Sequence, residues 1–84
     1  MTNNEILKKQ IIYRSNHRGV KEMDLLLGNF VKKYINVIEY NDLQDLMNIL
    51  AQEDEIIKKW YFEKESSNPV FNTNVSKMLK KFKV

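Results

Sequence analysis

The sequence is poor in the residues that most often carry chemistry: among its 84 residues are no cysteine, one histidine and two glycines. Without cysteine there can be no disulfide, no thiolate nucleophile and no cysteine-ligated zinc or iron–sulfur site. A single histidine, His17, cannot build a multi-histidine metal site or a Cys/His pair. Gly19 and Gly28 stand too far apart for a phosphate-binding loop or a dinucleotide fingerprint. These absences disfavour an enzyme.

Long apolar segments are also lacking. No run approaches the roughly 20 residues that a membrane-spanning helix needs, and residues 1–5 show no basic or apolar region of a targeting signal. We therefore expect a soluble protein without direct membrane insertion, located in the cytoplasm of a bacterium, with a processed organellar protein as the alternative. A length of 84 residues suits one domain, spanning residues 1–84, and we expect a monomer. Function should lie on the surface, because so small a core cannot surround an active site.

The charged residues are segregated along the chain. Residues 1–21 contain five basic residues and one acid, residues 22–65 contain ten acids and five basic residues, and residues 66–84 contain four lysines and no acid. A nucleic-acid-binding protein more often has one continuous basic stripe. A basic segment beside an acidic body suits a polar protein interface instead. We therefore predict a protein partner and no nucleic acid.

Apolar residues recur at intervals of three and four, which predicts an all-α protein of five helices. The clearest stripe follows Gly19 and runs from Met23 to Tyr34. Capping residues and first-turn acids predict where the other helices start: Thr2 with Glu5 for the first, Asn41 or Asp42 for the third, residues 53–55 for the fourth, and Asn72 or Thr73 for the fifth.

Residues 35–40 are β-branched and aromatic enough to suggest a strand, but a lone strand would have no partner in so helical a chain. We interpret them as a connector that buries Val37 or Ile38. Residues 66–69 are expected to end the fourth helix, because they combine serine, asparagine and proline. Trp60 is predicted to lie in the core, as a single tryptophan on an apolar helix face usually does.

Residues 13–24 join the first two predicted helices and gather polar side chains around Gly19. Glycine permits a turn or the close approach of another chain, and Arg18 and Glu22, four positions apart, can face each other. A purely structural interpretation is also open, in which Gly19 ends a helix and Arg18 and Glu22 form a local ion pair. His17 fits an exposed residue at a helix end better than a catalytic base, because it lacks the partners that catalysis needs.

Within this junction the sequence resembles the SdhE family, which is called succinate dehydrogenase assembly factor 2 in eukaryotes. Arg18, Gly19 and Glu22 match the RGxxE motif of that family, and the flanking residues 13–15 and 23–28 are also similar. The resemblance extends over about residues 11–62. It implies a compact five-helix bundle that binds the flavoprotein subunit of succinate dehydrogenase and, in some cases, that of fumarate reductase.

The resemblance also implies a function. Members of the family promote covalent attachment of FAD to a histidine of the flavoprotein subunit by holding that subunit in an arrangement from which attachment proceeds. Such a chaperone biases a conformational equilibrium, so it needs no stably bound cofactor and no catalytic group of its own. The alternative function is a small regulatory binding module, either antitoxin-like or nucleic-acid-binding.

For this sequence the resemblance predicts a partner-binding surface centred on Arg18 and Glu22, with Gly19 letting the partner's backbone come close. The surrounding contacts would come from Arg14, His17, Lys21 and Asp24. Asp24 fits a first-turn acid favoured by the helix dipole equally well. Met23 and the leucines that follow it are expected to pack in the core rather than to contact the partner.

Overall fold

A computed structural model describes residues 2–63 and 67–83 of the chain. These residues form five α-helices, one short 3-10 helix and no strand, which confirms the predicted all-α fold. The elements are α1 (Asn3–Asn16), α2 (Lys21–Tyr34), α3 (Tyr40–Leu50), α4 (Asp54–Glu63), η1 (Pro69–Phe71) and α5 (Asn74–Lys81).

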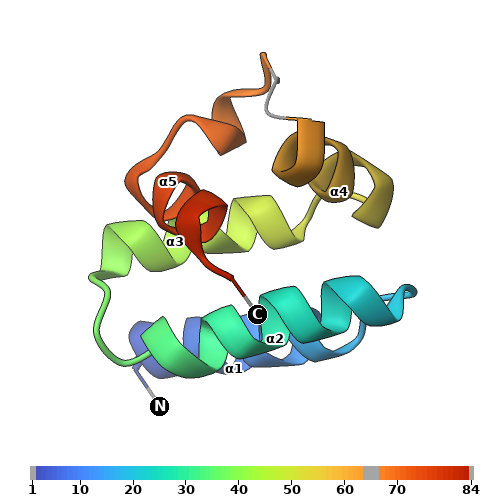
Figure 1. Cartoon of the computed structure of the whole chain (residues 1–84). Helices are drawn as coiled ribbons and strands as arrows, with labels where there is room; N and C mark the ends of the chain where they lie inside the picture. The colour runs from blue at the N-terminus through green and yellow to red at the C-terminus, as the bar shows by residue number, and fades with distance from the viewer. Residues whose placement is uncertain (1, 64–66, 84) are drawn as a thin grey trace.

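Figure 1 shows α1 and α2 side by side and antiparallel, as one layer of the bundle. α3 lies above this layer and packs on α1, and α5 and η1 in turn pack on α3. α4 begins near the turn that joins α1 to α2. The last described residues return toward α2, where the ring of Phe82 meets that of Phe30 edge to face with 5.5 Å between centroids. Both the start of α4 and the segment around Phe82 are therefore held against the first helical pair.

α2 carries the widest buried stripe, as its spacing predicts. The buried side chains recur at steps of one, three and four residues: Met23, Leu26, Leu27, Phe30 and Val31. Each contributes roughly 1.5–3 kcal/mol through burial of apolar surface. Leu25 is 49% exposed, so the expectation that every leucine after Met23 lies in the core is wrong at this position. Two residues along a helix turn a side chain by about 200°, which points Leu25 away from the core.

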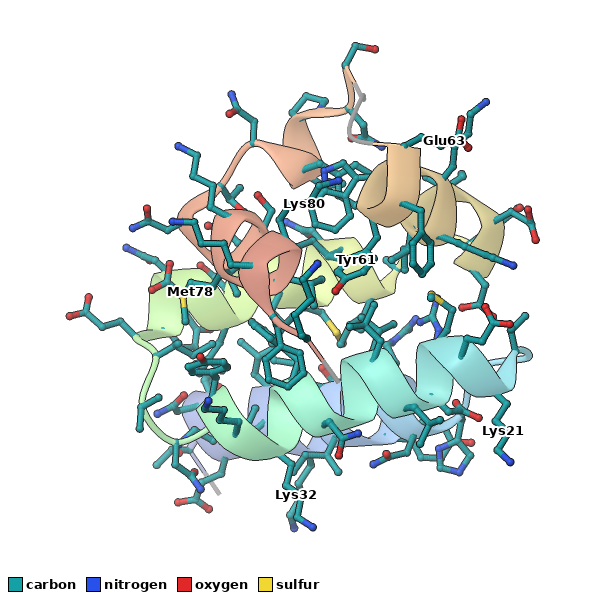
Figure 2. All side chains as sticks on the ribbon, viewed as in Figure 1. Lys21, Lys32, Tyr61, Glu63, Met78 and Lys80 are labelled. Atoms are coloured by element: carbon teal, nitrogen blue, oxygen red, sulfur yellow. The ribbon has the colours of Figure 1, made fainter. Side chains whose placement is uncertain are left out.

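Trp60 is only 6% exposed, which confirms its predicted place in the core. Its ring stacks on that of Phe71, with 4.4 Å between centroids and 10° between planes. The Lys80 ammonium lies 4.8 Å from the centre of the indole, and Figure 2 shows Lys80 between α5 and α4. Stacking and cation–π contact together fasten α4 to η1 and α5.

Three of the predicted helix starts are confirmed. α4 begins at Asp54, within the predicted residues 53–55, and its first turn carries the acids Asp54 and Glu55. Thr2 accepts a hydrogen bond from the backbone N–H of Glu5 at 3.1 Å, and it is the N-cap of α1. Thr73 and Ser76 form a full capping box at α5, in which each side chain accepts a hydrogen bond from the other residue's backbone N–H. These bonds satisfy donors that the first helical turn leaves unpaired.

The predicted cap of α3 is wrong. The helix begins at Tyr40, with Glu39 at the N-cap position and no side-chain cap bond. The backbone of Glu39 is extended and leads directly into the helix, so Asn41 and Asp42 fall inside the first turn. There Asp42 still benefits from the helix dipole.

The connector between α2 and α3 has no strand character, as predicted. Of the two candidates for burial, Ile38 packs partly against the core, whereas Val37 is 71% exposed. At the other end of the bundle, α4 runs to Glu63. Ser66, which belongs to the predicted helix-ending segment, lies outside the described residues.

Candidate functional site

The Arg18 side chain ties the α1–α2 turn to the α3–α4 turn. Its Nε donates a hydrogen bond to Oδ1 of Asp54 at 2.6 Å, and its two terminal nitrogens donate to the backbone carbonyls of Leu50 and Gln52, both at 2.7 Å. The side chain is 9% exposed. A guanidinium offers a rigid fork of donors, and here the fork bridges a carboxylate, the carbonyl of Leu50 at the C-terminal end of α3, and the carbonyl of Gln52 in the turn that follows.

Two carboxylates hold the backbone of the same turn. Oδ2 of Asp54 accepts a hydrogen bond from the N–H of Gly19 at 3.0 Å, and Oδ1 of Asp24 accepts one from the N–H of Arg18 at 2.8 Å. Asp24 therefore makes an internal contact in addition to being a first-turn acid of α2. Arg18, Asp24 and Asp54 form a connected set, called the inner clip below, which fixes the position of Gly19.

Gly19 lies on the outer side of this clip and is exposed. A Cβ added there would meet Oδ2 of Asp54 at 3.7 Å, an ordinary van der Waals distance. Its backbone does not adopt the left-handed conformation that favours glycine. Neither space inside the protein nor backbone conformation therefore requires glycine at this position. Gly28 differs, because its Cβ would come within 2.8 Å of Oδ1 of Asn16 on the neighbouring helix.

Glu22 projects outward from the first turn of α2. Its carboxylate lies 3.6 Å from the ammonium of Lys58 on α4, and the two side chains are 64% and 41% exposed. Arg18 pairs with Asp54 rather than with Glu22, which departs from the purely structural interpretation of a local Arg18–Glu22 pair. Exposed ion pairs contribute little stability, so Glu22 can exchange Lys58 for another partner at small cost.

The remaining predicted residues lie around this turn. Arg14 is exposed in the last turn of α1, where the helix dipole favours a cation. The ring of His17, also exposed, stacks on that of Tyr13 with 3.9 Å between centroids, and its Nδ1 lies 2.7 Å from the Tyr13 carbonyl oxygen. Lys21 projects away from the helices in Figure 2. Arg14 and His17 also line a hollow beside α1, together with Arg18.

The structure thus divides the seven predicted residues between two faces. The Arg18 side chain and the Asp24 carboxylate face inward, whereas the other five lie on the surface: Arg14, His17, Gly19, Lys21 and Glu22. Sequence reasoning missed Asp54 as the partner of Arg18. The two residues are 36 positions apart, and no helical periodicity links positions so distant. An acid at the start of α4 was noticed, but only for its effect on the helix dipole.

The part of the chain described by the structure contains no group of three or more histidine, cysteine, aspartate or glutamate side chains arranged to hold a metal ion. Across residues 2–63 and 67–83, no helix is both long and apolar enough to cross a membrane.

Comparison with known proteins defines the class. The family model described as flavinator of succinate dehydrogenase, Sdh5, matches residues 9–83, and the chain belongs to this family. This is the SdhE family that the motif residues indicate. No solved structure gives a significant match to the chain.

Curated relatives agree with this assignment. Succinate dehydrogenase assembly factor 2, mitochondrial, of Arabidopsis thaliana is 38% identical over 77 residues, which are 84% of this chain and 41% of that protein. The Dictyostelium discoideum protein of the same name is 37% identical over 82 residues, which are 92% of this chain and 58% of that protein. FAD assembly factor SdhE of Acetobacter pasteurianus is 34% identical over 55 residues, covering 66% and 50% of the two chains.

These relatives correct the predicted location. The expectation of a bacterial cytoplasmic protein is wrong, because the Arabidopsis and Dictyostelium relatives are mitochondrial proteins of eukaryotes and point to a mitochondrial protein. The chain spans about half the length of the curated relatives it matches, between 41% and 58% for these three. The first residues of the chain therefore carry no information about its compartment.

Proposed function

We propose that this chain is an assembly factor that binds the flavoprotein subunit of succinate dehydrogenase and promotes covalent attachment of FAD to it. Membership of the flavinator family supports this function, and the family match includes the whole α1–α2 junction. The observation that carries the proposal is Gly19. It is exposed and nothing inside the protein requires a glycine there, so close approach of a partner's backbone explains its presence.

In this proposal the chain acts by binding and supplies no catalytic group. A protein that binds one conformation of its partner more tightly shifts the partner's equilibrium by the difference in binding free energy, and about 1.4 kcal/mol of difference gives a tenfold shift. The flavoprotein subunit would then complete the attachment of FAD itself. In this proposal the assembly factor holds no FAD or metal stably.

The contact surface is centred on the outer face of the α1–α2 junction. Gly19 admits the partner's backbone, and Glu22 exchanges its exposed pairing with Lys58 for a contact with the partner. Arg18 and Asp24 contribute by holding the turn in place from within. The surrounding polar contacts come from three exposed side chains: Arg14, His17 and Lys21.

The test is co-expression of the chain with the flavoprotein subunit of succinate dehydrogenase, followed by measurement of covalent flavin fluorescence on a denaturing gel. Fluorescence of the subunit should rise strongly when the chain is present. Equal fluorescence with and without the chain would contradict the proposal. A parallel arm with the flavoprotein subunit of fumarate reductase determines whether that protein is also a partner.

Gly19→Arg tests the site itself. The substitution places bulk where the partner's backbone is proposed to approach, so it should abolish the gain in flavinylation. The free energy of unfolding should stay within about 0.5 kcal/mol, because the side chain can extend into solvent. Val37→Arg is the matched control, since it adds the same side chain to another exposed turn. If Gly19→Arg unfolds the protein, or leaves flavinylation intact, the proposed surface is wrong.

A further inference from the structure

An apolar groove lies beside Glu22, between α2 and the end of α4. Met23 and Leu26, both almost fully buried, form its floor together with Tyr61. Figure 2 shows Tyr61 in the space between α4 and α2. The groove has a volume of about 460 Å³, which is sufficient for a large apolar side chain with part of its backbone. It lies outside the hollow beside α1 and is lined by different residues.

The two walls of the groove are apolar side chains that the fold leaves in water. Leu25 from α2 is 49% exposed, and Phe62 from α4 is 59% exposed. A single exposed leucine or phenylalanine is common on protein surfaces. Here two such side chains, 37 positions apart in the sequence, line one hollow whose floor is also apolar. Burying them would contribute about 25 cal/mol for each Å² removed from water, so the groove is suited to receive an apolar group.

The rim of the groove is polar and carries charges of both signs. Glu22 stands on the α2 side, with Lys58 of α4 at 3.6 Å. Lys83 closes the groove on the side of the chain's end, where its ammonium lies 5.7 Å from the centre of the Tyr61 ring. Of the groove's lining residues, Glu22 is acidic and Lys83 is basic, which favours an occupant with a basic group near Glu22 and an acidic group near Lys83.

We propose that this groove binds a segment of the flavoprotein subunit with a bulky apolar side chain, an acidic residue directed at Lys83 and a basic residue directed at Glu22. The inference rests on the proposed function and names a second part of the same interface. Glu22 belongs to both parts, and Leu25 follows it by one helical turn, about 5 Å along α2. The groove is therefore continuous with the proposed surface around Gly19 and Glu22, and one partner can contact both.

Removal of the apolar walls is the first test. The affinity of Leu25→Ser/Phe62→Ser for the purified flavoprotein subunit, measured by calorimetry or surface-based binding, should be at least about tenfold weaker than that of the wild type. Both side chains are largely exposed, so the melting temperature should change little. Val37→Ser, which removes an apolar side chain that is 71% exposed elsewhere on the surface, should bind as the wild type does.

A charge reversal keeps the proposal testable if the double variant is unstable. Lys83→Glu should weaken binding several-fold, and the loss should shrink at high salt, because screening removes the repulsion. Lys77→Glu makes the same change of charge on the exposed part of α5 and should have no comparable effect. Equal binding by Lys83→Glu and Lys77→Glu would overturn the proposed occupant.

The wild-type arm separates failure of this inference from failure of the proposed function. If the wild type neither binds the flavoprotein subunit nor raises its flavinylation, both proposals are overturned. If the wild type does both, and the groove variants bind equally well, only the groove proposal is overturned. If the wild type forms a dimer that Leu25→Ser/Phe62→Ser abolishes, and flavoprotein binding is unaffected, the occupant is a second copy of the chain instead.

Discussion

The inner and outer faces of the α1–α2 junction are formed by the same short stretch of sequence, but the inner face is buried and hydrogen-bonded, whereas the outer face is exposed. On the inner face, Arg18 is 9% exposed and three of its hydrogen bonds reach the start of α4 and the end of α3. On the outer face, Gly19 and Glu22 are exposed, and Glu22 has only a loose contact with Lys58. Arg18 therefore holds the turn in place from within, whereas Gly19 and Glu22 form part of its exposed surface.

With the proposed partner surface on the outer face, substitutions on the two faces should differ in whether they change stability or partner binding. Substitutions on the inner face should lower the free energy of unfolding and affect flavinylation only as a consequence. Substitutions on the outer face should affect flavinylation with little change in stability. Three substitutions at Arg18 and Glu22 test this separation, and Tyr61→Phe, outside the junction, gives a reference for the loss of one hydrogen bond; the four follow in decreasing order of their expected effect on stability.

Arg18→Ala should have the largest effect. It removes the donor to Oδ1 of Asp54 and the donors to the carbonyls of Leu50 and Gln52, and breaking a largely buried ion pair costs about 3 kcal/mol. The melting temperature should fall by at least about 10 °C for a domain of this size. Urea denaturation followed by circular dichroism measures the loss. Arg14→Ala, at the exposed end of α1, is the matched control and should change stability by less than about 0.5 kcal/mol.

Arg18→Lys should have the next largest effect, about 2 kcal/mol. The ammonium keeps the charge beside Asp54 but cannot reproduce the planar fork that also reaches the carbonyls of Leu50 and Gln52. The same denaturation experiment measures it. Stability equal to that of the wild type would mean that charge alone holds the two turns together, and that the geometry of the inner clip has no part in it.

Tyr61→Phe should cost about 1 kcal/mol, because the Tyr61 hydroxyl donates a hydrogen bond to the carbonyl of Phe82. Burial raises the pKa of Tyr61 above its usual value of 10.0. A raised pKa means that the folded state binds the proton more tightly, so this contribution is complete below pH 10 and is lost as the pH rises through the raised pKa. Unfolding free energies measured across this range should therefore fall more steeply for the wild type than for Tyr61→Phe.

Glu22→Gln should have the smallest effect on stability, at most about 0.5 kcal/mol, because its pair with Lys58 is exposed and 3.6 Å long. Flavinylation of the flavoprotein subunit should nevertheless fall clearly. Glu55→Gln, also an exposed first-turn acid, is the control and should leave flavinylation unchanged. A large loss of stability in Glu22→Gln, or unchanged flavinylation, would contradict the division between the two faces.

Several elements could be predicted from the sequence because their causes are local. The stripe of α2, the Thr73 cap and the burial of Trp60 each follow from side chains within a turn or two. The start of α3 was mistaken, because the backbone of Glu39 determines it and no capping side chain marks it. The motif residues of the candidate site could be identified from the sequence through the family resemblance. The inward direction of the Arg18 side chain could not, because it depends on Asp54, 36 residues away.

By itself, the sequence determined the kind of protein this is: a helical chain without cysteine, whose apolar periodicity specifies the helices and whose motif residues indicate the family. These properties follow from neighbours within a few positions. Only the tertiary structure decided which motif side chains face inward, and that Leu25 and Phe62 line one groove beside Glu22. The physical reason is that burial and hydrogen bonding at the junction depend on how α4 is placed against α2, and that placement depends on packing across the whole core.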